Sequence, residues 1–187
     1  MEKITFCERG IFMKKKLSYL FLLFLAYAII GWCYEVFLEV VIYQWGFSNI
    51  GFLFGPYCPV YGFGALLLLF CLNGIRLKKK WYSPILVFLG TVFLTTALEL
   101  LTSYILEFTT GHWLWDYTRY QIQFDGRIAL NPSIRFGLGG LFFLYIVQPL
   151  LEKAGKGMGE KRCIKLASIL FCIVLIDFIG SIVYRVL

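Results

Sequence analysis

The sequence has little of what soluble enzymes use for catalysis or metal binding. Its one histidine, His112, is not part of a Ser-His-Asp arrangement and gives little support for a zinc site. A Gly-rich phosphate loop of the Walker type is missing, which argues against ATP hydrolysis by this chain itself. The six cysteines include no Cys-x-x-Cys pair, and we interpret them as small apolar packing residues. We therefore expect no cofactor and no metal ion.

A polar stretch long enough for a sizeable soluble domain is also missing. Hydrophobic residues make up 60% of the chain. Apolar runs long enough to cross the ~30 Å hydrocarbon core of a bilayer recur along it. The sequence therefore predicts an all-α integral membrane protein with about five transmembrane helices. We expect these spans at residues 17–43, 59–75, 84–106, 134–151 and 166–186.

The N-terminal residues allow more than one interpretation. We expect a basic cytoplasmic N-terminus at residues 1–16, followed by a single polytopic membrane domain at residues 17–187. Met13 directly precedes three lysines, so residues 1–12 can be an upstream extension. A cleavable signal peptide is the alternative, because a basic segment is followed by an apolar run and small residues. The apolar run continues beyond that point, which favours a retained signal anchor.

The positive charges are distributed unevenly over the connections between the spans. The formal net charge is +7, and 14 of the 18 cations precede span 1, separate spans 2 and 3, or separate spans 4 and 5. Cytoplasmic loops of membrane proteins are enriched in Lys and Arg, so this pattern predicts the N-terminus inside and the C-terminus outside. The basic residues therefore indicate the lipid bilayer, with its anionic headgroups, as the partner and not nucleic acid.

A segment rich in glycine and proline separates the first two spans. Residues 49–64 contain four glycines and two prolines and no charged residue. Proline removes a backbone donor and glycine permits close approach of chains, so this segment cannot be one uninterrupted helix. Bent backbone at membrane depth must be buried or line a cavity, and a re-entrant path is one way to achieve this. The candidate pocket wall therefore includes Asn49, Gly55, Pro56, Pro59, Tyr61 and Gly62.

Acidic residues occur inside three of the predicted spans. Glu35 lies ~27 Å along the first span by helical rise, with Gly31 one turn earlier, where a glycine permits another helix to approach. Glu99 lies ~21 Å along the third span, on a polar stripe of residues four apart. A charge at that depth costs roughly 2.5–3.5 kcal/mol, so the stripe should face the interior or a wet cavity. For Glu99 and for Asp177 in the last span, a functional site and a structural hydrogen bond are about equally supported.

The longest outer connection, residues 108–133, holds further candidates. The run Trp115-Asp116-Tyr117 suits a lid at the membrane surface, although an aromatic belt explains the same residues. Arg127 is predicted on the same outer side as Glu35 and Glu99, where opposite charges lower each other's cost of burial. The candidate polar site is therefore Glu35, Glu99, Asp116 and Arg127, and the pocket wall gains Trp32, Trp115 and Tyr117.

Several of these motifs together resemble a known family. They are Gly31-Trp32-x-x-Glu35, Asn49-x-Gly51-Phe52-Leu53-x-Gly55-Pro56-x-x-Pro59-x-Tyr61-Gly62-x-Gly64, Glu99, Trp115-Asp116-Tyr117 and Gly126-x-Ile128-x-Leu130-x-x-Ser133. In this order they resemble the bacterial multi-pass proteins of the putative ABC-transporter type IV family, over roughly residues 17–151. Gln123, Ala129 and Phe136 depart from the family's pattern, which weakens a chemical role for these three positions.

The resemblance implies a permease-like subunit that moves a solute across the bacterial cytoplasmic membrane with an ATPase in trans. The short cytoplasmic connections favour a second membrane subunit or a homo-oligomer. One alternative is an intramembrane enzyme acting on a lipid or lipid-linked substrate. In that enzyme Glu35 or Glu99 would be the general base, and Arg127 would hold a phosphate or carboxylate. A non-catalytic membrane partner, whose polar stripes serve only helix packing, is the third alternative.

Overall fold

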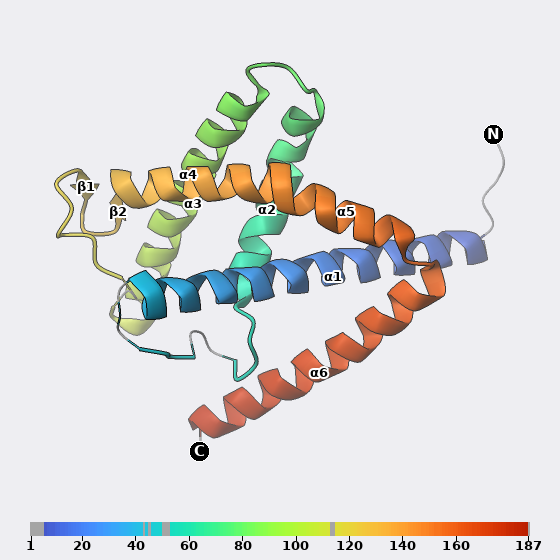
Figure 1. Cartoon of the computed structure of the whole chain (residues 1–187). Helices are drawn as coiled ribbons and strands as arrows, with labels where there is room; N and C mark the ends of the chain where they lie inside the picture. Colours follow the sequence, from blue (N-terminus) through green and yellow to red (C-terminus); the bar gives the residue numbers. More distant parts are fainter. Residues whose placement is uncertain (1–5, 43, 45, 50–52, 113–114, 187) are drawn as a thin grey trace. The chain divides into compact units, whose positions relative to one another are not determined.

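The computed structural model describes residues 6–42, 44, 46–49, 53–112 and 115–186 (Figure 1). Of the described residues, 79% are helical. Among the described residues, five helical segments are long and apolar enough to cross a membrane: Met13–Ile42, Pro59–Leu77, Ser83–Thr109, Leu130–Gly157 and Glu160–Tyr184. The predicted all-α fold with five spans is therefore confirmed.

Most of the helices extend beyond the apolar runs that predicted them. The fourth span, predicted at residues 134–151, is built from α4 (Leu130–Phe142), a π-helical turn η2 (Phe143–Val147) and α5 (Gln148–Gly157). Helices can continue into the headgroup region, where their polar end turns meet water, so an apolar run underestimates their length.

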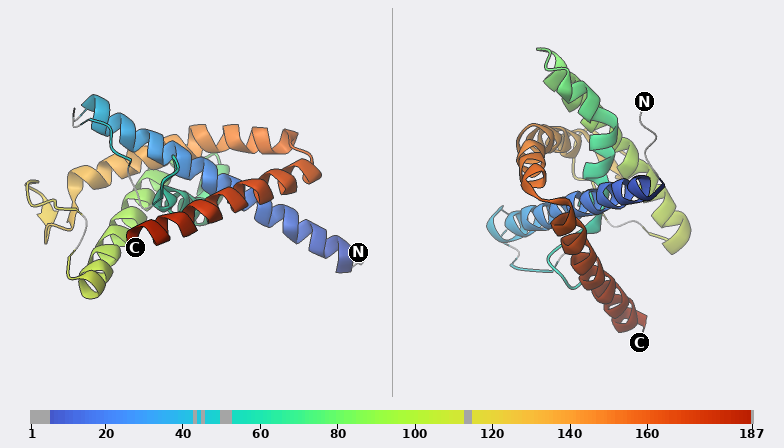
Figure 2. Two further views of the ribbon diagram at one scale, coloured as in Figure 1. Left: turned by 90° about the horizontal axis from the view of Figure 1, so that it is seen from below. Right: turned by 90° about the vertical axis from the view of Figure 1, so that its right-hand side faces the viewer.

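The chain divides into two compact units, residues 1–66 with 151–187 and residues 67–150. In the first unit, α1 (Phe6–Phe37) leads into a π-helical turn, η1 (Leu38–Ile42), and packs against α6 (Glu160–Val186). Figure 2 shows α6 crossing α1. Their core holds Leu25, Ala28, Leu53 and Tyr57. The prediction of a single membrane domain at residues 17–187 stays a prediction.

The second unit is built around the contact between α3 (Ser83–Thr110) and α4. Pro84 stands in the first turn of α3, where its missing N–H costs no hydrogen bond. On α4, a Cβ at Gly137 would collide with Phe88, and one at Gly140 would collide with Thr91. Small residues let helix backbones approach closely, so these glycines set the packing of α4 on α3.

A β-hairpin precedes α4 in the second unit. β1 (Gln123–Phe124) pairs antiparallel with β2 (Ile128–Ala129) in the register Phe124 opposite Ile128. Asp125 (φ 55°) and Gly126 (φ 66°) form the turn, and the Arg127 N–H donates to the Phe124 carbonyl over 3.0 Å. Positive φ at both central residues of the β-turn 124–127 is the type I′ conformation, which an Asp-Gly pair favours.

The π-helical turn η2 leaves a backbone carbonyl that the neighbouring helix satisfies. The Gln148 N–H donates to the Phe143 carbonyl, five residues earlier. At the same spacing, the donor for the Leu144 carbonyl would come from Pro149, which has no N–H. Nη1 of Arg76, in the last turn of α2 (Pro59–Leu77), donates to this Leu144 carbonyl over 3.0 Å. The buried Arg76 therefore supplies the Leu144 carbonyl of the fourth span with a donor.

The interruption predicted between the first two spans is also present. The described residues 46–49 and 53–58 are not helical, and α2 begins at Pro59. Residues 50–52, which include Gly51 of the glycine-proline segment, lie outside the described residues. A re-entrant path for this segment stays a prediction.

Candidate functional site

Glu35, near the end of α1, is paired with a tyrosine from α2. The hydroxyl group of Tyr61 donates to Oε1 of Glu35. One turn earlier on α1, a Cβ on Gly31 would collide with the ring of Tyr61. The prediction that Gly31 permits a close approach beside Glu35 is therefore confirmed, and the approaching group is the Tyr61 side chain.

Asn49 holds the interrupted segment to α1. Its Oδ1 accepts a hydrogen bond from Nε1 of Trp32 over 3.0 Å. Its Nδ2 donates to the carbonyls of Leu53 (3.2 Å) and Phe54 (3.0 Å). Backbone carbonyls outside a helix need donors when water is absent, and the Asn49 amide supplies them here.

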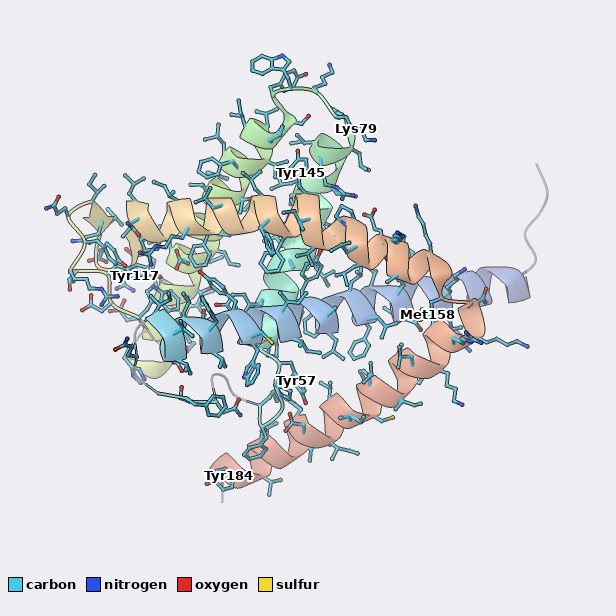
Figure 3. The ribbon with its side chains drawn as sticks, in the orientation of Figure 1. Tyr57, Lys79, Tyr117, Tyr145, Met158 and Tyr184 are labelled. Atoms are coloured by element: carbon cyan, nitrogen blue, oxygen red, sulfur yellow. The ribbon has the colours of Figure 1, made fainter. Side chains whose placement is uncertain are left out.

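Asp177 of α6 binds the same segment from the other side. Its Oδ1 accepts the N–H of Phe54 over 3.2 Å, and its Oδ2 accepts the N–H of Gly55 over 3.0 Å and the hydroxyl hydrogen of Tyr57. Figure 3 shows Tyr57 in the connection, between α1 and α6. The sequence left the role of Asp177 open, and it was not among the candidate site residues. The signal for this role in the sequence is an acidic residue within a span, because the N–H groups of a non-helical segment at membrane depth need acceptors.

Two side chains close to Asp177 in this segment, Tyr57 and Cys58, have raised pKa values. Burial, together with the hydrogen bond to Asp177, raises the pKa of Tyr57. Burial also raises the pKa of the neighbouring Cys58 thiol, which lowers its reactivity because the thiolate is the nucleophile. The N–H of Cys58 donates to the Ala28 carbonyl on α1 over 3.0 Å. The end of the segment is therefore bound to both α1 and α6.

The remaining candidates of the first unit lie within this segment or in the first turn of α2. Pro56 is exposed, and Pro59 is the first residue of α2. A Cβ on Gly62 would collide with Phe24 of α1, so the start of α2 lies directly against α1.

Glu99 of α3 is paired with a tyrosine in the second unit. The hydroxyl of Tyr117 donates to Oε1 of Glu99 over 2.9 Å. Oε2 of the same carboxylate is buried and has no hydrogen-bond partner among the residues that the structure describes. A buried carboxylate oxygen without a donor is costly, so this atom is available for a proton or for a ligand that donates a hydrogen bond.

The hairpin holds the Trp115-Asp116-Tyr117 run in place. Nε1 of Trp115 donates to the Arg127 carbonyl over 2.8 Å, and the N–H of Tyr117 donates to the Gly126 carbonyl over 2.8 Å. Asp116 is exposed, and its carboxylate accepts the N–H (2.9 Å) and the hydroxyl hydrogen (3.0 Å) of Thr118. These two bonds lower the pKa of Asp116.

Arg127 is buried in an ionic cluster. Its Nε donates to Asp125 over 2.7 Å and its Nη2 donates to Glu107 over 2.6 Å. The guanidinium carbon lies 4.1 Å from the centre of the Tyr104 ring. The bond to Asp125 raises the pKa of Arg127, and the same bond lowers the pKa of Asp125. An anionic substrate at Arg127 would have to compete with two carboxylates of the chain itself.

The predicted site residues therefore form two groups. Glu99, Asp116, Arg127, Trp115 and Tyr117 belong to the second unit, where hydrogen bonds join Tyr117 to Glu99 and both aromatic residues to the hairpin. The first unit contains Glu35, Trp32, Asn49, Gly55, Pro56, Pro59, Tyr61 and Gly62. The meeting of Glu35 with Glu99, Asp116 and Arg127 stays a prediction.

One arrangement is common to three acids in the membrane spans. Glu35, Glu99 and Asp177 each accept a hydrogen bond from a tyrosine hydroxyl, supplied by Tyr61, Tyr117 and Tyr57 respectively. A phenol can donate to a carboxylate without adding a charge, which suits a site that must exist in a medium of low dielectric constant.

The five spans and the tyrosine-bound carboxylates define a multi-pass helical membrane protein with polar sites inside its spans. The model of one family, described as "Putative ABC-transporter type IV", matches residues 22–182. The chain belongs to this family, which places it among transport-related membrane proteins. No curated protein matches the chain. No solved structure matches it either.

Proposed function

We infer that this chain is a permease-like membrane subunit of an ABC-type transport system, which moves a solute across the cytoplasmic membrane with an ATPase in trans. Family membership over residues 22–182 supports the transport class. The structural observation that carries the inference is Glu99, whose Oε2 is buried without a hydrogen-bond partner among the described residues. Ionisable groups inside spans typically mark pathways for substrates or ions.

In this proposal the carboxylate of Glu99 lines the path of the solute within the second unit, and Glu35 is a second polar site within the first unit. Each carboxylate can accept hydrogen bonds from a passing solute or take up a proton, and its tyrosine partner keeps it oriented. The Trp115-Asp116-Tyr117 run is the cover of this path, because Tyr117 connects it to Glu99. In the first unit, Asn49, bound by Trp32, and residues 53–58, bound by Asp177, supply the wall of the Glu35 site.

The proposed location is the bacterial cytoplasmic membrane, with the N-terminus inside and the C-terminus outside. The distribution of the cations supports this orientation. The connections on the proposed cytoplasmic side are short, which leaves little surface for an ATPase. We therefore include self-association into a homo-oligomer, or a second membrane subunit, in the proposal.

Purification of the tagged chain from its own host in a mild detergent tests the transport proposal. We expect an ATPase to co-purify in a fixed ratio, and we expect Glu99→Gln to retain this partner while losing solute-dependent stimulation of its activity. Glu160→Gln, at the start of α6, is the matched control and should keep both. Purification without an ATPase, or Glu99→Gln with full stimulation, would contradict the proposal.

Two other functions give different results in the same experiment. An intramembrane enzyme would copurify with a lipid and without an ATPase, and it would need an anion site other than Arg127, which already binds Asp125 and Glu107. A non-catalytic partner would copurify with another membrane protein and tolerate Glu35→Gln and Glu99→Gln.

A further inference from the structure

The second unit contains an open groove between α3, α4 and the hairpin. Its volume is about 630 Å³. The α3 side is formed by Leu89, Val92, Phe93, Thr96, Ala97 and Leu100. β1, β2 and the first turn of α4 form the other side. The groove therefore lies along two of the membrane spans and ends at the hairpin.

The few polar side chains of the groove are already engaged within the protein. Thr96 donates to Oγ of Ser133 over 2.7 Å, and Ser133 donates to the Ala129 carbonyl over 2.9 Å. Oε1 of Gln123 accepts the N–H of Gly126 over 2.7 Å. A polar solute would find no uncommitted side-chain oxygen here, so the groove favours an apolar ligand.

The length of the groove corresponds to one leaflet of a bilayer. The α3 wall runs from Leu89 to Leu100, which is ~16 Å at the rise of an α-helix. Half of the ~30 Å hydrocarbon core is about the same length. The ligand that fits by chemistry and by length is therefore a single hydrocarbon chain that lies parallel to α3.

A cation lies near the hairpin end of the groove. Arg119 is exposed and lies 5.4 Å from the centre of the Tyr120 ring. It precedes the lining residue Ile122 by three positions, so the chain keeps their Cα atoms within ~11 Å. An acyl chain in the groove would therefore place the phosphate of its headgroup within reach of Arg119, and we expect the headgroup at this end.

We propose that this groove binds one acyl chain of a membrane phospholipid, with the headgroup on the hairpin side. The site is separate from the solute path of the proposed function, since neither Glu35 nor Glu99 lines it. Bound lipid would fill the space beside Thr96 and Ser133 and so support the contact between α3 and α4. The groove is then a lipid site built into the second unit.

Photolabelling of the whole chain in vesicles tests this proposal. The vesicles contain phosphatidylethanolamine and phosphatidylglycerol, with a trace of phosphatidylglycerol that carries a diazirine in one acyl chain. We expect labelled peptides from residues 89–100 and 122–133. Ala97→Trp should lower this labelling about tenfold, because a ring that displaces roughly two methylene groups removes the corresponding apolar contact.

Leu98→Trp is the matched control, since Leu98 is exposed on the same helix and does not line the groove. We expect this variant to be labelled as strongly as the wild type. Should Ala97→Trp fail to fold, the smaller Ala97→Met should still weaken the labelling of residues 89–100. Equal labelling of the groove in Ala97→Trp and Leu98→Trp would overturn the proposal.

Native mass spectrometry of the protein extracted from its host distinguishes the possible occupants. A retained phospholipid, lost in Ala97→Trp and kept in Leu98→Trp, supports the proposal. A retained isoprenoid-linked lipid would overturn it and assign the groove to a lipid-linked substrate. A dimer that only Ala97→Trp disrupts, with no lipid bound to the wild type, would overturn it and assign the groove to a second copy of the chain.

Discussion

Tyr117 donates its hydroxyl hydrogen to one oxygen of Glu99 over 2.9 Å, while the other oxygen is buried without a hydrogen-bond partner among the described residues. Tyr117 comes from the connection between α3 and α4, and Glu99 comes from α3, so this bond joins the connection to a membrane span. The pair therefore combines a structural contact with an atom that is available for a ligand.

The first prediction concerns this pair. Tyr117→Phe should lower the free energy of unfolding by about 1–3 kcal/mol, because the buried carboxylate loses its donor. Glu99→Gln should change it by less than about 1 kcal/mol, since the amide oxygen can still accept from Tyr117. Unfolding in detergent can be followed with a dye that reacts with thiols as Cys58 and Cys163, both buried, become exposed. Tyr120→Phe is the control, and equal losses for Tyr117→Phe and Tyr120→Phe would contradict the prediction.

The second prediction concerns Asp177 and Cys58. Asp177→Ala removes the acceptor of three hydrogen bonds from residues 54–57, so the segment should separate from α6 and expose Cys58. In a variant that keeps Cys58 as its one cysteine, we expect labelling by a water-soluble maleimide to become roughly tenfold faster, which corresponds to ~1.4 kcal/mol of lost local stability.

Two variants make the experiment on Cys58 specific. Asp177→Asn keeps a carbonyl oxygen that can accept from the segment, so its labelling rate should lie between those of wild type and Asp177→Ala. Glu160→Gln removes another acid of α6 that has no contact with residues 54–57 among the described hydrogen bonds, and it should not change the rate. Unchanged labelling in Asp177→Ala would show that Asp177 does not hold the segment.

The third prediction concerns the pH dependence of the hairpin. The bond from Arg127 holds the pKa of Asp125 below its unfolded value, so Asp125 contributes stability above the unfolded pKa of about 3.9. This contribution should be lost as the pH falls through the lower folded pKa. Thermal midpoints measured at decreasing pH should therefore fall less steeply for Asp125→Asn than for the wild type. Identical slopes below about pH 4 would contradict this assignment.

The fourth prediction concerns Arg76 and Pro149. Arg76→Met should destabilise the protein by roughly 1.5–3 kcal/mol, because the Leu144 carbonyl loses a hydrogen bond from a charged donor. Pro149→Ala restores an N–H five residues after Leu144 and should therefore reduce the cost of Arg76→Met. A double-mutant cycle on thermal unfolding measures this coupling. Additive effects of the two changes would contradict the inference that Arg76 replaces the N–H donor that Pro149 lacks.

Local sequence features were sufficient for the spans and for the interruption between the first two. Long apolar runs are buried in a bilayer as helices, and the two prolines of the segment, Pro56 and Pro59, cannot lie in the interior of one. Gly31 likewise indicated a close approach, although it did not identify Tyr61 as the partner. The hairpin was not predicted although Asp125-Gly126 is a strong hairpin signal, because its strands, with two residues each, are too short to show an alternating pattern.

The pairing of distant residues could not be deduced from one sequence. The acceptor role of Asp177 depends on residues 120 or more positions earlier, and Arg76 reaches a carbonyl 68 positions later. Such pairs are determined by the packing of helices and not by local spacing. Arg127 was predicted on the same outer side as Glu35 and Glu99, and the sequence did not indicate that its guanidinium group binds Asp125, two positions away, and Glu107, 20 positions away.

The three hydrogen bonds between Asp177 and the interrupted segment connect α6 mechanically to that segment. α6 is 27 residues long, and its first turns carry Lys161, Arg162 and Lys165 of the basic connection on the proposed cytoplasmic side. A shift of α6 along its own axis would therefore move Phe54, Gly55 and Tyr57 with it. In a transporter, α6 would transmit a displacement of its cytoplasmic end, where the ATPase would bind, to the segment that forms the wall of the site.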